Sequence, residues 1–148
     1  MKSKIKILLL ITLFFFFNFS PIYSIEGFNF EITEIEIIDN GNKFLGKNRG
    51  KITTDSKVII EADNFNYNKS TNILKLNGNV IIDDINRNLK IYSEEVIYFK
   101  NEEIFTSEKN SKFINTKDGL EIVAEKFHYN KFTNVLKLNK NVKIKDVK

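Results

Sequence analysis

Apolar and polar residues alternate along most of the chain after residue 24. Ile35 and Ile37 alternate with glutamates, and Leu74 and Leu76 flank Lys75. A period of two places alternate side chains on opposite faces of a β-strand. Segments rich in Asn, Asp, Gly and Lys separate these runs, which is typical of turns. The pattern therefore predicts eight to ten short antiparallel strands, each with one apolar face and one solvent-exposed face.

Residue usage agrees with the strand pattern. From Ile25 onward the chain has 18 Ile, 7 Val and 7 Thr, but only two Ala. The β-branched residues favour strands, and Ala is the residue that most favours helices. The sequence therefore predicts a single all-β domain over residues 25–148.

An internal repeat organises this domain. The segment 60–84 recurs as the segment 122–146, and 16 of the 25 positions are identical. A weaker copy lies halfway between them, so the unit is about 31 residues long. Within each unit the apolar phase slips, as it does between Ala62 and Phe65, which predicts a bulge or bend. The middle copy departs from the pattern over 107–111, which leaves its strand pairing open.

Repeated antiparallel strands with one apolar face have to stack around a common interior, because one unit cannot bury its face alone. The pattern predicts which large side chains point inward. They are Phe65, Tyr67, Leu74, Leu76, Val80, Ile82, Ile91, Val96, Tyr98, Phe105, Phe113, Ile122, Phe127, Tyr129, Leu136, Leu138, Val142 and Ile144.

The N-terminus has the order of a secretory signal peptide. Lys2, Lys4 and Lys6 precede an apolar stretch from Ile7 to Phe17, and a small residue follows at Ser24. This order predicts export and a signal segment over 1–24, with an uncleaved N-terminal anchor as the alternative. In either case the folded domain lies outside the cytoplasm, and without Cys it has no disulfide framework.

Charge and chemistry exclude several functions. Without the first 24 residues the chain has 20 basic and 19 acidic residues, so it lacks the basic surface that nucleic-acid binding requires. Asp83–Asp84 and Glu102–Glu103 fall in predicted turns with no His at ligand spacing, so we interpret them as solvated. The lone His128 is predicted on the wet face. We therefore expect no enzymatic activity, no metal and no cofactor.

One basic segment is a separate candidate for ligand binding. Gly46 to Lys51 brings three cations together between predicted strands. Such a cluster can meet a lipid phosphate, and a simple polar loop is the other interpretation.

The repeated motif is similar to the OstA-like repeat of lipopolysaccharide-transport proteins. Its signature, A-D/E-x-F-x-Y, then a turn with Thr-Asn, L-x-L and N-V-x-I, occurs from Ala62 to Ile82 and again from Ala124 to Ile144. The resemblance covers roughly Phe28 to Val147. It implies a twisted β-jelly roll with a partly open seam, of the LptA kind or of the N-terminal domain of LptD, with an anchored LptC-like role as a third alternative.

The resemblance also implies a ligand and partners. The apolar interior would be a groove for the acyl chains of lipid A, and rolls of this kind join end to end into a bridge between membranes. The first and last strands, Glu31 to Ile38 and Asn141 to Val147, would leave unpaired edges, with Ile35, Ile37, Lys143 and Lys145 as contacts to another Lpt roll or a second copy. A module that binds extracytoplasmic polysaccharide through its wet face is the alternative.

Overall fold

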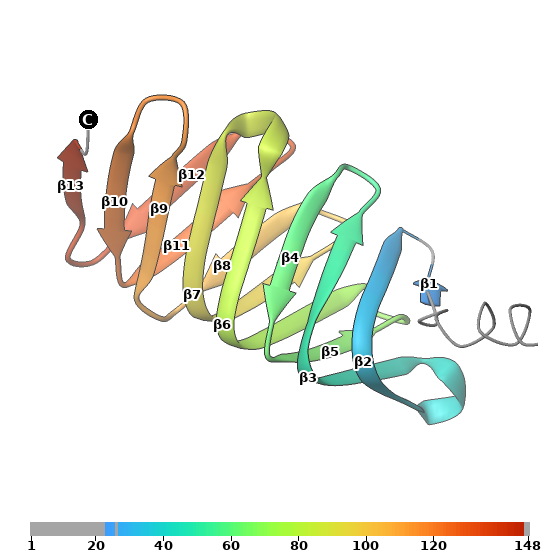
Figure 1. Cartoon of the computed structure of the whole chain (residues 1–148). Helices are drawn as coiled ribbons and strands as arrows, with labels where there is room; N and C mark the ends of the chain where they lie inside the picture. Colours follow the sequence, from blue (N-terminus) through green and yellow to red (C-terminus); the bar gives the residue numbers. More distant parts are fainter. Residues whose placement is uncertain (1–22, 26, 147–148) are drawn as a thin grey trace, which may run out of the picture.

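The structure is a computed structural model that describes residues 23–25 and 27–146 of the 148-residue chain. The described residues form thirteen β-strands and two short 3-10 helices, in one continuous antiparallel sheet (Figure 1). The elements are β1 (Tyr23–Ile25), β2 (Phe28–Ile38), η1 (Asp39–Gly41), β3 (Lys43–Thr54), β4 (Val58–Ala62), β5 (Asn64–Asn68), β6 (Ile73–Asp84), η2 (Ile85–Arg87), β7 (Leu89–Phe99), β8 (Ile104–Ser107), β9 (Ser111–Asn115), β10 (Leu120–Ala124), β11 (Lys126–Asn130), β12 (Val135–Asn139) and β13 (Lys143–Asp146).

The all-β jelly roll expected from the sequence is confirmed, although the number of strands is larger than the eight to ten predicted. Each predicted phase slip separates two strands, as it separates β4 from β5 and β10 from β11. The predicted signal segment lies outside the described residues except for its last two residues, which belong to β1. No helix among the described residues has the length and apolarity to cross a membrane.

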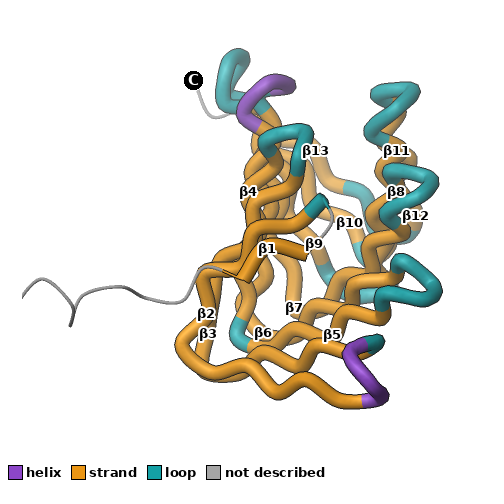
Figure 2. Tube along the Cα trace, turned by 90° about the vertical axis from the view of Figure 1, so that its right-hand side faces the viewer, coloured by secondary structure: helices purple, strands orange, loops and turns teal. Residues whose placement is uncertain are grey.

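The sheet folds over into two layers. The long strands β2, β3, β6 and β7 bend in the middle and contribute one half to each layer. The front layer adds β1, β4, β9, β10 and β13, and the back layer adds β5, β8, β11 and β12 (Figure 1). Viewed along the roll, the layers join at the bends, and their backbones diverge toward the turns on the other side (Figure 2), where the Arg87 side chain reaches from one layer to the other.

The residues that define the repeated motif stabilise the bend. The Asp63 N–H donates to the Gly78 carbonyl at 2.9 Å, and the Asn79 amide donates to the Asp63 carboxylate at 2.7 Å. Gly78 and Asn79 both have positive φ, a region that Gly and Asn tolerate best. In the second copy Glu125 bonds to Lys140 and Asn141 in the same way. The predicted bend after Ala62 is therefore present in both copies.

The middle unit is paired despite its divergent sequence. Both β8 and β9 pair with β7. At the bend between β8 and β9 the hydroxyls of Ser107 and Ser111 lie 3.2 and 3.0 Å from the hydroxyl of Ser93. These buried hydroxyls bond to one another and to the Lys109 carbonyl, so the divergent segment is an alternative way of making the same bend.

Turns from the two layers face each other on the side of the roll opposite the bends. The front layer contributes the turns 55–57, 85–88 and 116–119, and the back layer contributes 69–72, 100–103 and 131–134. Each series follows the 31-residue unit. We call the line along which the two series face each other the seam.

Candidate functional site

The interior of the roll is a continuous apolar row in each layer. In the front layer, residues paired directly across neighbouring strands run from Phe30 at one end to Ile144 at the other. Side chains at directly opposite positions lie on the same face of a sheet. The complete row is Phe30, Ile52, Ile60, Ile82, Ile91, Phe113, Ile122 and Ile144.

The back layer has two matching rows. One passes through Tyr67, Leu74, Tyr98, Phe105, Tyr129 and Leu136. The other passes through Phe65, Leu76, Val96, Ser107, Phe127 and Leu138, in which Ser107 is the polar member. Because neighbours along a strand face opposite ways, Lys75 and Lys137 are exposed on the outer face, as the alternation predicted.

The predicted interior residues differ in burial along the roll. Those from the first two repeats, together with Phe113, Phe127 and Tyr129, are at most 3% exposed. Ile122, Leu136 and Leu138 are only partly buried. Val142 and Ile144 are 43% and 66% exposed, although Ile144 pairs with Ile122 and so continues the inward-facing row. They lie in and just before β13, the last strand among the described residues, which pairs with β10 on one side.

The seam is polar, and its residues repeat with the 31-residue unit. Tyr67, Tyr98 and Tyr129 are each 1% exposed, with their rings in the back-layer row. Burial raises the pKa of Tyr98 and of Tyr129 well above the usual value of a phenol, so both hydroxyls remain protonated donors. The interior therefore changes from apolar to polar at the level of the tyrosine hydroxyls.

Backbone bonds between successive back-layer turns also repeat. The N–H groups of Lys69, Lys100 and Lys131 donate to the carbonyls of Asn42, Asn72 and Glu103 at 2.8, 3.0 and 2.9 Å. The three lysines are spaced by 31 residues, as the tyrosines are. One bond per unit thus ties each back-layer turn to the one before it.

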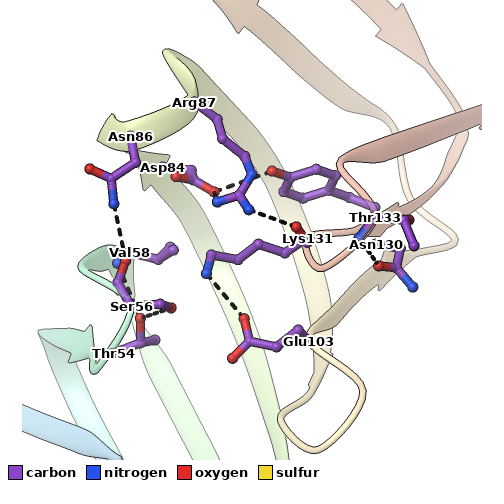
Figure 3. Close-up of polar contacts among 11 residues, drawn as sticks. Thr54, Ser56, Val58, Asp84, Asn86, Arg87, Glu103, Asn130, Lys131 and Thr133 are labelled. Atoms are coloured by element: carbon purple, nitrogen blue, oxygen red, sulfur yellow. Dashed lines mark hydrogen bonds and ion pairs between the residues drawn. The ribbon is translucent and has the colours of Figure 1, made fainter.

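Each of the two acidic pairs that we predicted to be solvated has one member with a buried or charge-paired carboxylate. Asp84 is the last residue of β6 and is 1% exposed, with the Arg87 guanidinium 3.1 Å away (Figure 3). Glu103 lies in a turn, but its carboxylate is 3.2 Å from the ammonium of the buried Lys131. The solvated interpretation is therefore wrong for Asp84 and Glu103. The signal that would have identified Asp84 is its inward phase after Val80 and Ile82.

The basic segment Gly46 to Lys51 is not a loop. It is the bend of β3, with Asn48 and Arg49 at positive φ. Arg49 forms ion pairs with Glu61 at 2.8 Å and with Asp63 at 3.3 Å. Its charge therefore stabilises the bend of its own sheet.

His128 and the acidic side chains are the remaining candidates for metal or catalytic chemistry in the part of the chain that the structure describes. No group of three His, Asp or Glu side chains is arranged there to hold a metal ion. His128 lies on the outer phase of β11 opposite Thr106 and Lys137, which is the face the pattern predicted. The structure instead brings together the residues of the apolar rows and the polar residues along the seam.

Comparison with known proteins places the chain among lipopolysaccharide-assembly proteins. The model of the family described as lipopolysaccharide-assembly, LptC-related, matches residues 47–146, which is more than half of the chain. The chain belongs to this LptC-related family. The matched segment includes both full copies of the repeat and the whole middle unit.

A solved structure has the same fold as this LptC-related chain. It is the crystal structure of LptH from Pseudomonas aeruginosa, described as the LptA-homologous periplasmic component of the lipopolysaccharide transport device. The likeness has a TM-score of 0.70 at 12% identity and covers 80% of this chain and 93% of LptH. A search of curated proteins gives no match.

Proposed function

We propose that this chain is a periplasmic lipopolysaccharide-transport protein or domain that shields the acyl chains of lipid A inside its roll. The observation that supports this most directly is the apolar rows, which cross every unit of the roll and end on a partly open face at Leu136, Leu138 and Ile144. In this proposal the chain is exported by its N-terminal segment and makes or breaks no covalent bond.

The energetics of an apolar interior fit a lipid cargo. Each methylene that leaves water stabilises the bound state by about 0.8 kcal/mol. Because successive units present similar apolar residues, neighbouring positions along the rows have similar affinity for an acyl chain. A lipid can then pass from unit to unit without being trapped in one deep site.

Site-specific photo-crosslinking tests this role. A compact diazirine amino acid at Leu138 or Leu76 faces the interior, whereas the same probe at Lys137 or Lys75 faces water one residue away. With purified lipopolysaccharide we expect capture at the leucine positions and at least tenfold less at the lysine positions.

Two results would contradict the proposal. Equal capture at the leucine and lysine positions would mean that lipid does not select the interior. Capture of delipidated polysaccharide at the lysine positions, with no lipid capture at the leucines, would support the alternative of a polysaccharide-binding module.

We further propose that the roll joins an Lpt partner roll or a second copy at its two edges. The outer edge of β2 is covered by β1 only at Phe28–Phe30, which leaves the stretch with Ile35 and Ile37 uncovered by the described residues. At the other end β13 pairs with β10 on one side. Ile37 is 49% exposed and Ile144 is 66% exposed, so both ends combine a strand edge with apolar side chains.

Proline substitution distinguishes the two sides of β13. Successive N–H groups along a strand point in opposite directions, so of Lys143→Pro and Ile144→Pro one loses a bond to β10 and the other loses an outward donor. We expect the variant that keeps the wild-type melting temperature to show weaker self-association in analytical ultracentrifugation. Identical sedimentation of that variant and of the wild type, both monomeric at high concentration, would contradict edge pairing of two copies.

A further inference from the structure

Two turns from opposite layers meet across the seam. The front-layer turn 85–88 carries Arg87, whose guanidinium donates to the carbonyl of Lys131 in the back-layer turn 131–134 at 2.8 Å (Figure 3). Just beneath this contact the hydroxyl of Tyr129 donates to the carboxylate of Asp84 at 3.2 Å. These two bonds join residues 44 and 45 positions apart in the sequence, and each crosses from one layer to the other.

The residues at this crossing are charged and largely buried. Asp84 is 1% exposed, and its second oxygen, Oδ1, has no hydrogen-bond partner among the described residues. The Lys131 side chain is 7% exposed and is paired with Glu103. Buried ion pairs contribute little net free energy, because the cost of removing their hydration offsets much of their attraction. If the layers separate here, each of these groups regains water, so separation costs less than it would for an apolar contact.

The equivalent tyrosines of the other units have hydrogen-bond partners in their own hairpins. Tyr67 donates to Asn72 at 2.8 Å, and Tyr98 bonds to Glu103, each five residues further along its own hairpin. In the unit of Tyr129 the tyrosine hydroxyl bonds to a carboxylate of the front layer.

Access to the interior points to the seam. On the opposite side β2, β3, β6 and β7 run continuously from one layer to the other, so the backbone closes that side. Beneath the seam the ring of Phe105 stacks on those of Tyr98 and Tyr129. The distances between ring centroids are 4.1 Å to Tyr98 and 6.3 Å to Tyr129. An acyl chain that enters from the side has to part the turns and displace these rings.

We propose that Asp84, Arg87, Tyr129 and Lys131 form a clasp that holds the seam closed in the lipid-free roll and opens when acyl chains enter. This inference rests on the lipid-shielding function proposed above and names the place on the roll where lipid passes. Opening separates the turn 85–88 from the turn 131–134 and leaves the bends of the long strands intact.

Distance measurements on the lipid-free protein test the closure. The chain has no Cys, so spin labels can be placed at Asn86→Cys and at Phe132→Cys. Both positions are exposed, and they are next to Arg87 and Lys131 in the sequence. We expect one short, narrow distance distribution by double electron–electron resonance. Asp84→Asn, which removes the charge but preserves size, is expected to lengthen and broaden it.

The control for this measurement is Tyr67→Phe, which removes a buried hydroxyl at the equivalent place of the first copy. Its distance distribution is expected to match that of the wild type, with circular dichroism showing that both variants are folded. An unchanged distribution in Asp84→Asn and in an Arg87→Gln variant would overturn the clasp.

A chemical tether tests whether lipid entry requires opening. A short bismaleimide joining Asn86→Cys to Phe132→Cys ties the two layers together, and a diazirine amino acid at Leu76 reports lipopolysaccharide in the interior. We expect the tether to reduce capture at least tenfold. A matched tether between Asn101→Cys and Phe132→Cys joins two turns of the back layer and is expected to leave capture unchanged.

The outcomes separate the two proposals. Capture that is equally efficient with and without the interlayer tether would overturn the clasp and leave the lipid-shielding function in place. If the untethered protein captures no lipid at any interior position, the proposed function fails and the entry role of the clasp fails with it, whereas the distance measurement still decides whether the seam is held closed.

Discussion

The two full copies of the repeat have nearly the same sequence but different surroundings. In the first copy Leu74, Leu76, Val80 and Ile82 are at most 1% exposed. In the second copy the matching Leu136 and Leu138 are partly buried, and the side chains of the last two matching positions are 43% and 66% exposed. The motif is the same, and what changes is the number of neighbouring units.

The difference follows from the position of each copy in the roll. The strand β6 of the first copy has neighbours on both sides in each layer, because it pairs with β4, β5 and β7. Among the described residues, the matching strands β12 and β13 each pair on one side, with β11 and β10. A repeat protein buries its interior through contacts between units, so the apolar side chains of the last described unit are more exposed than their counterparts in the first.

A charged side chain introduced at matching positions of the two copies is expected to give the largest difference in the free energy of unfolding. Ile82→Asp places an unpaired carboxylate in the packed front layer and is expected to destabilise the fold by about 3–5 kcal/mol. Ile144→Asp changes a side chain that is already 66% exposed and is expected to cost less than about 0.5 kcal/mol. Urea unfolding monitored by circular dichroism measures both, and equal losses would contradict the comparison.

Truncation of the paired leucines tests the same contrast with a milder change. Leu76→Ala is expected to cost about 2–5 kcal/mol, because it leaves a cavity in a fully packed region. Leu138→Ala removes a partly solvated side chain and is expected to cost about 1 kcal/mol. A larger loss for Leu138→Ala than for Leu76→Ala in urea unfolding would show that the open end is covered in solution.

The paired tyrosines test the seam. Tyr129→Phe removes the donor to the buried Asp84 carboxylate and is expected to cost about 2 kcal/mol. Tyr67→Phe removes a donor to the Asn72 amide and is expected to cost about 1 kcal/mol. Thermal unfolding of the two variants provides the comparison, and the reverse order would mean that the bond to Asp84 carries little of the closure.

Alkaline pH is expected to have the smallest effect on the stability of the fold. Because burial raises the pKa of Tyr98 and Tyr129 above the unfolded value of about 10, the folded state holds its protons more tightly than the unfolded state. Their contribution is complete below pH 10 and is lost as the pH rises above it, by about 1 kcal/mol per tyrosine at pH 11. Tyr129→Phe should show a shallower loss of stability between pH 10 and 11 than the wild type, and an identical slope would contradict the burial of its hydroxyl.

Local patterns in the sequence determined much of this fold. The alternation around Leu74 and Leu76 predicted which side chains face inward, because successive side chains of a strand lie on opposite faces of the sheet. The slip of the apolar phase between Ala62 and Phe65 predicted the bend after Ala62, where the motif residues Asp63 and Asn79 bond to each other. The family resemblance carried by those residues agrees with the LptC-related family and with the fold of LptH.

Other features depended on contacts that the local pattern does not contain. The exposure of Val142 and Ile144 depends on whether another unit follows in space, and the burial of Asp84 depends on Tyr129 and Arg87. The two copies share their inward apolar residues, so the difference in burial comes from the neighbours of each copy. The sequence by itself therefore determined the strands, their faces and their bends, whereas the tertiary structure decided which end of the apolar rows is open and where charged residues close the seam.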